Sequence, residues 1–183
     1  MKAKSLFVLL AACLALSVQA QEFDDQSSSS GVELDVQMHW LGGVSPISPI
    51  SGQWGAEIGF GLVSPKKINA FGAAIGYTNG LAKHMTSHKL PIYVYDRLYF
   101  SSKDTSPFID LALGGMVNLK TKMDEDYGGL SSKGGGHMLL RTGLGLSIAT
   151  NSNLKVHLKV GYQLLYNKAA GHSVYFAIGF GTR

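Results

Sequence analysis

One segment near the C-terminal end, Leu154–Tyr166, alternates apolar side chains with Lys, His, Gly and Gln residue by residue as far as Leu164. It reads LKVHLKVGYQLLY, so one face of an extended strand carries Leu, Val and Tyr, and the other carries Lys, His, Gly and Gln. A period of two that lasts for a dozen residues is the pattern of a β-strand whose two faces meet different surroundings. The segment therefore predicts a long strand with one apolar face.

The same alternation recurs along the chain and predicts eight strands in all. The predicted strands are Val32–Trp40, Gln53–Val63, Ile68–Thr78, Lys89–Phe100, Pro107–Leu119, His137–Ala149, Leu154–Tyr166 and His172–Gly181. Strands of about 9–11 residues with alternating hydropathy, joined by turns, are typical of membrane-spanning β-barrels. We therefore predict an all-β fold, an eight-stranded antiparallel up-and-down transmembrane β-barrel.

The connections between these strands alternate between long and short. The long ones are Leu41–Gly52, Asn79–His88 and Lys120–Gly136, the short ones are Ser64–Lys67, Ser101–Ser106 and Thr150–Asn153, and a final link is Asn167–Gly171. Outer-membrane barrels have short turns on the periplasmic side and longer loops outside. We therefore expect the three long connections to be displayed on the outer surface.

The segment Met1–Ala20 has the pattern of a cleaved secretory signal peptide. Lys2 and Lys4 precede the apolar run Leu6–Leu16, which is too short to span a bilayer as a helix, and a small-x-small site ends at Ala20. This pattern predicts export from the cytoplasm. A polar, serine-rich segment, residues 21–31, then predicts a disordered leader ahead of a barrel domain, residues 32–183.

The single cysteine, Cys13, allows a second interpretation of this leader, because the preceding Leu10-Ala11-Ala12 also fits a lipoprotein processing site. Cleavage after Ala20 would instead leave a mature chain without any thiol, and so without disulfides or cysteine-based metal sites. Removing Lys2 and Lys4 leaves 14 of the 16 basic residues against 12 acidic ones. The charge balance therefore gives no argument for a nucleic-acid partner.

The composition of the two strand faces predicts which one lies inside. The less apolar face is mostly Gly, Ala and Ser, which fits the narrow interior of an eight-stranded barrel and would solvate an exterior poorly. Only 15% of the residues are charged. We expect the Leu, Val, Ile and Phe face to meet lipid, with aromatic residues near the strand ends as interfacial girdles, namely Trp40, Trp54, Tyr77, Tyr99, Phe100, Phe108, Tyr166 and Phe180. The alternative is a soluble lipid-binding barrel with the apolar face inward.

A small set of charged residues falls on the predicted inner face. The predicted lumen charge network consists of Glu33, Asp35, Glu57, Asp110, Arg141, His157 and Lys159, and His39 lies on the same face. Glu57 and Arg141 lie on strands opposite one another in an eight-strand ring, so their long side chains are expected to meet near the axis. Buried charges need partners, which predicts a structural plug of salt bridges. A gated ion path would require these pairs to exchange partners.

The fourth predicted strand carries adjacent opposite charges, and we expect Arg97 to point inward and Asp96 to lie near the periplasmic interface. Three other groups suggest chemistry only weakly. His84 and His88 share a predicted loop but lack further metal ligands, and the acidic segment Asp124–Asp126 lacks the alternating oxygen ligands of a calcium loop. His172 and Ser173 are strand neighbours and point to opposite faces, so they cannot form a base–nucleophile pair. We assign no catalytic residue, cofactor or metal.

Several segments resemble the small eight-stranded outer-membrane proteins of the OmpA/OmpX type, which are grouped with outer-membrane β-barrel domain and porin-family proteins. The segments are Leu90–Val94 with Arg97–Phe100, Ser106–Asp110 with Gly114-Gly115, and the Gly-x-Gly at Gly143 and Gly145. The resemblance implies an outer-membrane protein of a Gram-negative cell envelope with a structural or surface-interaction role. Its implied partners are lipopolysaccharide, the barrel assembly machinery and an extracellular loop ligand. A narrow channel and a lipid A-modifying enzyme are the alternatives within this class.

Overall fold

The computed structural model of the chain describes residues 31–43, 52–66, 68–82, 85–123, 131–132, 134–150, 154–167 and 169–182. The predicted signal peptide, most of the leader, Cys13, His84 and the acidic segment Asp124–Asp126 lie outside these residues. The strands are β1 (Gly31–Gly43), β2 (Gly52–Val63), β3 (Asn69–Ala82), β4 (Met85–Tyr99), β5 (Thr105–Met123), β6 (Ser131–Ser132), β7 (Gly136–Ala149), β8 (Leu154–Asn167) and β9 (Ala169–Thr182). Within the described part of the chain, no helix is long and apolar enough to cross a membrane.

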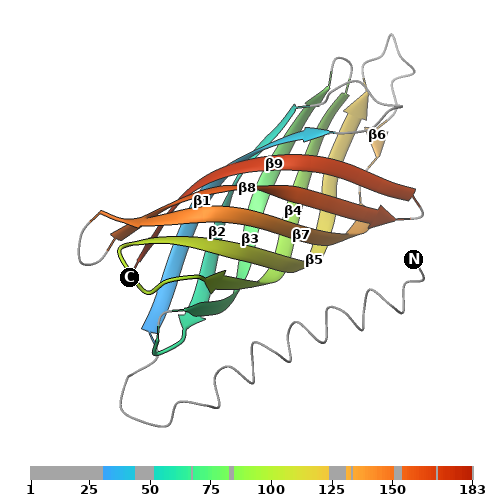
Figure 1. Cartoon of the computed structure of the whole chain (residues 1–183). Helices are drawn as coiled ribbons and strands as arrows, with labels where there is room; N and C mark the ends of the chain where they lie inside the picture. The colour runs from blue at the N-terminus through green and yellow to red at the C-terminus, as the bar shows by residue number, and fades with distance from the viewer. Residues whose placement is uncertain are drawn as a thin grey trace.

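Eight of these strands form a closed antiparallel barrel, as the sequence predicts. Each of the eight pairs with its neighbours in chain order, β4 pairs with β5, and β1 pairs with β9 to close the ring. The two-residue β6 adds only to the end of β5. Figure 1 shows strands of the near wall crossing those of the far wall obliquely, because closing a sheet into a barrel requires tilted strands.

The two ends of the barrel differ in their connections. We call the turn side the end where β1 begins and β9 finishes, with Asp35 opposite Gly181 in the β1–β9 register. Residues 64–68, 100–104 and 150–153 connect strands at this end, and the other end is the loop side. Backbone hydrogen bonds from Ser64 N to Asn69 O and from Phe100 N to Pro107 O close two of the turns.

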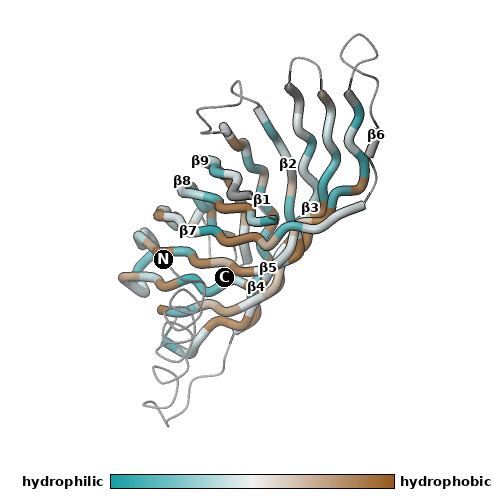
Figure 2. The backbone as a smooth tube through the Cα atoms, turned by 90° about the vertical axis from the view of Figure 1, so that its right-hand side faces the viewer, coloured by the Kyte–Doolittle hydropathy of each residue, from teal (hydrophilic) through white to brown (hydrophobic). Residues whose placement is uncertain are grey.

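The alternation along each strand separates an apolar outer face from a polar inner face. In β1, Val32, Leu34 and Val36 are exposed, whereas Glu33 and Asp35 between them are buried. Figure 2 shows the same succession of brown and teal stretches along single strands. The less apolar face therefore lies inside, as the sequence predicts, and the apolar face does not line a ligand cavity.

Two of the predicted connections are instead mostly strand. The predicted loop Asn79–His88 continues as β3 to Ala82 and as β4 from Met85, with Asn79 paired to His88. The predicted link Asn167–Gly171 is reduced to residue 168, between β8 and β9. These strand ends carry polar residues that resemble a loop, because strands that project beyond an apolar band no longer need outward hydrophobic side chains.

The two remaining predicted loops are shorter than expected. β1 extends to Gly43 into the predicted loop Leu41–Gly52. β5 extends to Met123 into the predicted loop Lys120–Gly136, which also contains β6. The expected alternation of long and short connections therefore fails at β3–β4, and the final link between β8 and β9 is shorter than predicted.

Most of the predicted girdle aromatics lie on the outer surface. Trp40, Trp54, Tyr77, Phe100, Tyr166 and Phe180 are exposed. Tyr99 and Phe108 are not, because they share the alternation phase of Arg97 and Asp110 and point into the lumen. The girdle prediction was wrong for these two rings, since position near a strand end does not decide direction.

Candidate functional site: the charged lumen

All seven residues of the predicted lumen network are buried, with at most 5% of each exposed. They come from β1, β2, β5, β7 and β8, so the network joins strands on opposite walls of the barrel. The structure gathers them, together with Arg97, into two clusters along the barrel axis. The strand order places one cluster toward the turn side, where Glu33 and Asp35 begin β1, and the other farther along β1 at Gln37 and His39.

The first cluster is organised around Arg97 on β4. Its guanidinium donates from Nη1 to Glu33 Oε1 at 2.9 Å, from Nη2 to Asp35 Oδ2 at 2.7 Å and from Nε to Asp110 Oδ2 at 3.2 Å. One side chain thus binds three carboxylates from two different strands, β1 and β5. The fixed fork of the guanidinium suits this arrangement, because its donors point in several directions within one plane.

Two lysines of β8 complete the charge balance of this cluster. Lys159 Nζ lies 3.3 Å from Asp110 Oδ2, and Lys155 Nζ lies 3.5 Å from Glu33 Oε2. The cluster, which we call the Arg97 cluster, therefore contains three acidic and three basic side chains, Glu33, Asp35, Asp110, Arg97, Lys155 and Lys159. Such balance is what allows charged groups to remain buried together.

The second cluster is centred on the predicted pair Glu57 and Arg141. Arg141 Nη1 donates to Glu57 Oε1 at 2.7 Å across the barrel, and Arg141 Nε donates to Gln163 Oε1 at 2.6 Å. The other carboxylate oxygen, Glu57 Oε2, accepts from Tyr93 Oη at 2.5 Å and from Gln37 Nε2 at 2.7 Å. We call these five residues the Arg141 cluster.

His39 lies beside the Arg141 cluster. Its Nδ1 lies 3.5 Å from Glu57 Oε1, and its Nε2 lies 3.1 Å from Thr78 Oγ1, within hydrogen-bond distance. His157 lies instead beside the Arg97 cluster, with its ring edge-on to Phe108. The two buried histidines therefore accompany different clusters.

Several members of these clusters were missing from the predicted network. The sequence predicts that Arg97 points inward but does not place it in the network, and the predicted network also lacks Gln37, Tyr93, Lys155 and Gln163. Alternation alone places each of them on the inner face, since each shares the phase of a predicted lumen residue. Lys155 is charged and lies on this face, so it could have been predicted, whereas the neutral Gln37, Tyr93 and Gln163 give no sign of belonging to a charge network.

Aromatic rings fill the space between the clusters and the wall. The Arg97 guanidinium lies 5.0 Å from the Phe108 ring centroid, and the Arg141 guanidinium lies 5.1 Å from that of Tyr93. The cavity left beside Asp35, Tyr93 and Lys159 measures only about 10 Å³, close to the space that a single water molecule needs. The described side chains are therefore closely packed at this level of the lumen.

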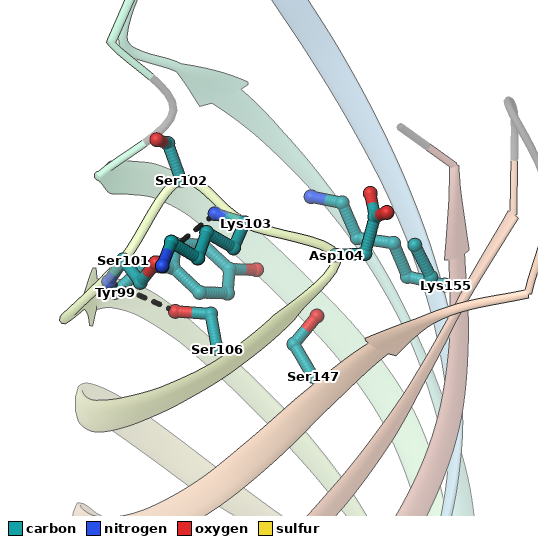
Figure 3. A pocket seen from close by; sticks show the side chains of 9 residues that line it. Tyr99, Ser101, Ser102, Lys103, Asp104, Ser106, Ser147 and Lys155 are labelled. Carbon is teal, nitrogen blue, oxygen red and sulfur yellow. Dashed lines mark hydrogen bonds between the residues drawn. The ribbon is translucent and has the colours of Figure 1, made fainter.

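A shallow pocket opens at the turn side, above the Arg97 cluster. Figure 3 shows the serines of the β4–β5 connection around it, with the Tyr99 ring at its base and Lys155 at its rim. The pocket has about 20 Å³ of free space. Two residues that line it, Tyr99 and Lys155, also contact Glu33, at 3.2 and 3.5 Å.

The residues proposed for other chemistry lie elsewhere. His88 belongs to β4 rather than to a loop, and its Nδ1 pairs with the Tyr77 hydroxyl on the outer surface. His172 is exposed and pairs in the same way with Tyr162, whereas Ser173 beside it is buried. His172 and Ser173 thus point to opposite faces, as the sequence predicts. Asp96 is expected near the interface. Alternation would turn its side chain outward, because Tyr95 and Arg97 on either side point inward, yet only 6% of Asp96 is exposed.

Comparisons by sequence identify no relative. No family model matches the chain, and no curated protein matches it.

Comparison with solved structures finds the same barrel in other proteins. Neisserial surface protein A (TM-score 0.61, 15% identity) matches 86% of this chain and 99% of its own. Ail, the attachment invasion locus protein of Yersinia pestis (TM-score 0.56, 10% identity), matches 85% of this chain and 99% of its own. The N-terminal β-barrel domain of Pseudomonas aeruginosa OprF (TM-score 0.53, 11% identity) matches 84% of this chain and 99% of its own. The likeness is one of fold, that of eight-stranded outer-membrane barrels.

Proposed function

We propose that this chain is an integral outer-membrane protein, exported by a cleaved signal peptide at Met1–Ala20, whose barrel domain has a structural or surface-interaction role. The observation that carries the proposal is the apolar outer face. Each of the eight barrel strands contributes exposed large hydrophobic side chains, such as Val36, Phe60, Leu144 and Phe176. A belt of this extent is far larger than the apolar patches of soluble monomers, and hydrocarbon is the surrounding that it fits.

The packed lumen supports one of the roles open to such a barrel over another. The two clusters and the aromatic rings leave no described passage along the axis, which supports a plug rather than a channel. A role at the surface is also supported by the names of two proteins with this fold, the Neisserial surface protein and the Yersinia attachment protein. The proposed partners are lipopolysaccharide around the belt, the barrel assembly machinery, and an extracellular ligand at the connections after β1 and β5.

Heat modifiability tests this proposal directly. The full chain, expressed with its own leader, is fractionated, and outer-membrane samples are compared by electrophoresis with and without boiling. A closed barrel resists detergent until it is heated, so the expected result is a mobility shift in the outer-membrane fraction. An unshifted band in the soluble fraction would contradict the proposal and point to a water-soluble protein.

A further inference from the structure

Three potential metal ligands meet inside the barrel near the turn side. Glu33 and Asp35 of β1 and His157 of β8 each offer one ligand atom, and these atoms all lie within 4.8 Å of one another. All three residues are buried. Carboxylate oxygen together with imidazole nitrogen is a ligand set of zinc and related transition metals.

Part of this ligand set has no partner within the described structure. Neither ring nitrogen of His157 has a hydrogen-bond partner, although the residue is only 3% exposed, and Asp35 Oδ1 is also buried without one. A buried polar atom without a partner destabilises the native state. An imidazole nitrogen and a carboxylate oxygen that both lack partners at one place point to a ligand that binds the two together.

The strand between these residues leaves room for them to approach. β9 lies between β1 and β8, and its inner face carries Gly179 and Gly181 at this level. A Cβ atom at Gly179 would lie 3.0 Å from Asp35 Oδ1, and one at Gly181 would lie 2.8 Å from His157 Nε2. Glycine at both positions thus keeps the space between the carboxylate and the imidazole free of side chains.

Neighbouring groups orient both carboxylates, on one oxygen of Asp35 and on both oxygens of Glu33. Arg97 binds Asp35 through Oδ2, which leaves Oδ1 turned away from the guanidinium. Glu33 accepts from Arg97 on Oε1 and from the Tyr99 hydroxyl on Oε2. Carboxylates that bind metals are oriented by hydrogen bonds of this kind from outer groups.

We propose that Glu33, Asp35 and His157 form a binding site for a divalent transition-metal ion, with zinc as its best-fitting ion. One imidazole nitrogen, two carboxylates and a water molecule would complete a tetrahedral zinc site. The ion joins β1 to β8 across β9, at the seam where the first and last strands close the barrel. It therefore stabilises the closure of the ring, and it does so independently of where the protein resides.

The charge balance of the Arg97 cluster identifies the group with which the ion competes. Three basic side chains already neutralise its three carboxylates, so a divalent cation has to displace one of them. Lys155 is that group, because its 3.5 Å contact with Glu33 is the longest ion pair of the cluster and its side chain is the most exposed. Lys155 also lines the turn-side pocket of Figure 3, so its side chain can move toward solvent when an ion takes its place at Glu33.

Zinc binding to the purified, folded protein in detergent tests the site. The metal-free chain is titrated with zinc by calorimetry, and bound zinc is counted by mass spectrometry after desalting. The wild type is expected to bind one zinc ion. His157→Gln is expected to lower the affinity for zinc by more than about tenfold. His39→Gln, at the other buried histidine, and His172→Gln, at an exposed one, are the controls and are expected to retain it.

Asp35→Asn and Lys155→Met extend the test. Asp35→Asn is expected to lower the affinity for zinc as His157→Gln does. If His157→Gln fails to fold and loses the heat-modifiable band, Asp35→Asn is the variant that tests the site. Lys155→Met removes the competing ammonium and is expected to bind zinc more tightly than the wild type. In the wild type, zinc raises the temperature at which the folded band disappears, because a ligand of the native state shifts unfolding.

Three outcomes would overturn the proposal. The first is a wild type that retains no zinc after desalting. The second is binding that survives both His157→Gln and Asp35→Asn, or that falls equally in His172→Gln, which would show surface adsorption. The third is an unchanged zinc affinity in Lys155→Met, which would place the ion away from Glu33.

Discussion

Arg97 shows how much a single side chain decides inside a narrow barrel. It is 2% exposed and binds three carboxylates through three different nitrogens. Removing the guanidinium leaves its carboxylate partners buried, charged and unpaired. This lowers the free energy of unfolding by far more than the ion pairs themselves contribute to it. The destabilisation comes from the carboxylates that remain, not from the guanidinium that is lost.

We therefore expect Arg97→Gln to lower the free energy of unfolding by about 3–5 kcal/mol. The measurement is urea unfolding of the barrel reconstituted in lipid vesicles, followed by the heat-modifiable band. Lys103→Gln is the matched control, because Lys103 is exposed on the β4–β5 connection and its loss is expected to stay within about 0.5 kcal/mol. Equal stability of Arg97→Gln and the wild type would show that the carboxylates find other partners.

At the level of the strands, paired glycines make room for rings from the inner face. Gly61 of β2 pairs with Gly72 of β3 beneath Tyr95, and Gly143 of β7 pairs with Gly161 of β8 beside Tyr175. A Cβ at Gly61 would lie 2.7 Å from Tyr95 Oη. Glycine pairs covered by a ring are a known device for packing curved sheets, and here they allow aromatic side chains to fill a narrow lumen.

The Gly143 position gives this device a test. A Cβ there would lie 2.5 Å from Tyr175 Oη, so Gly143→Ala is expected to lower the free energy of unfolding by about 1–3 kcal/mol through overpacking. Tyr175→Phe alone is expected to be at least as stable as the wild type, because this buried hydroxyl has no hydrogen-bond partner among the described residues.

Tyr175→Phe is expected to recover part of the loss when combined with Gly143→Ala. Urea unfolding of the four proteins gives the coupling energy of the pair. Simple additivity would mean that the ring does not meet the added methyl group, and would refute the packing argument.

The outer face of β7 tests the proposed contact with lipid. Leu144 is exposed near the middle of the strand, and Leu154 is exposed at the turn-side start of β8. In vesicles, Leu144→Arg is expected to cost about 2–4 kcal/mol and Leu154→Arg about 0–1 kcal/mol, because the cost of an outward charge depends on its depth in the bilayer. Equal and small costs at both positions would indicate that this face meets water.

For the whole molecule, the two clusters lie in series along one axis. The Arg97 cluster lies toward the turn side and the Arg141 cluster farther along β1, so either is expected to block the passage without the other. Wild-type barrels in a planar bilayer should therefore show no steady conductance.

The series arrangement predicts the behaviour of variants. Glu57→Ala with Arg141→Ala empties one cluster and should leave the bilayer silent. Arg97→Ala with Asp110→Ala should do the same, whereas all four changes together should conduct, with the heat-modifiable band confirming that each variant is folded. Steady conductance in the wild type would contradict the closed lumen and move the function to a channel.

Much of this architecture was readable from the chain itself. Strict alternation, as in Leu154–Tyr166, determines the strands and the two faces, because successive strand residues must point to opposite sides. The small and charged inner face also shows which side is the lumen. Loops were harder to predict, since polar residues such as Asn79 and His88 occur both in loops and in strands that extend beyond an apolar band.

The partners inside the lumen were decided only by the tertiary structure. Glu57 and Arg141 could be predicted as a pair from the positions of their strands in the ring. The sequence did not predict that three carboxylates surround Arg97. It also did not predict that His157 approaches Asp35 across Gly179 and Gly181. Alternation gives the direction of each side chain but not its height along the axis. That height depends on the stagger of every strand pair around the closed ring, and only closure of β1 against β9 determines which side chains meet.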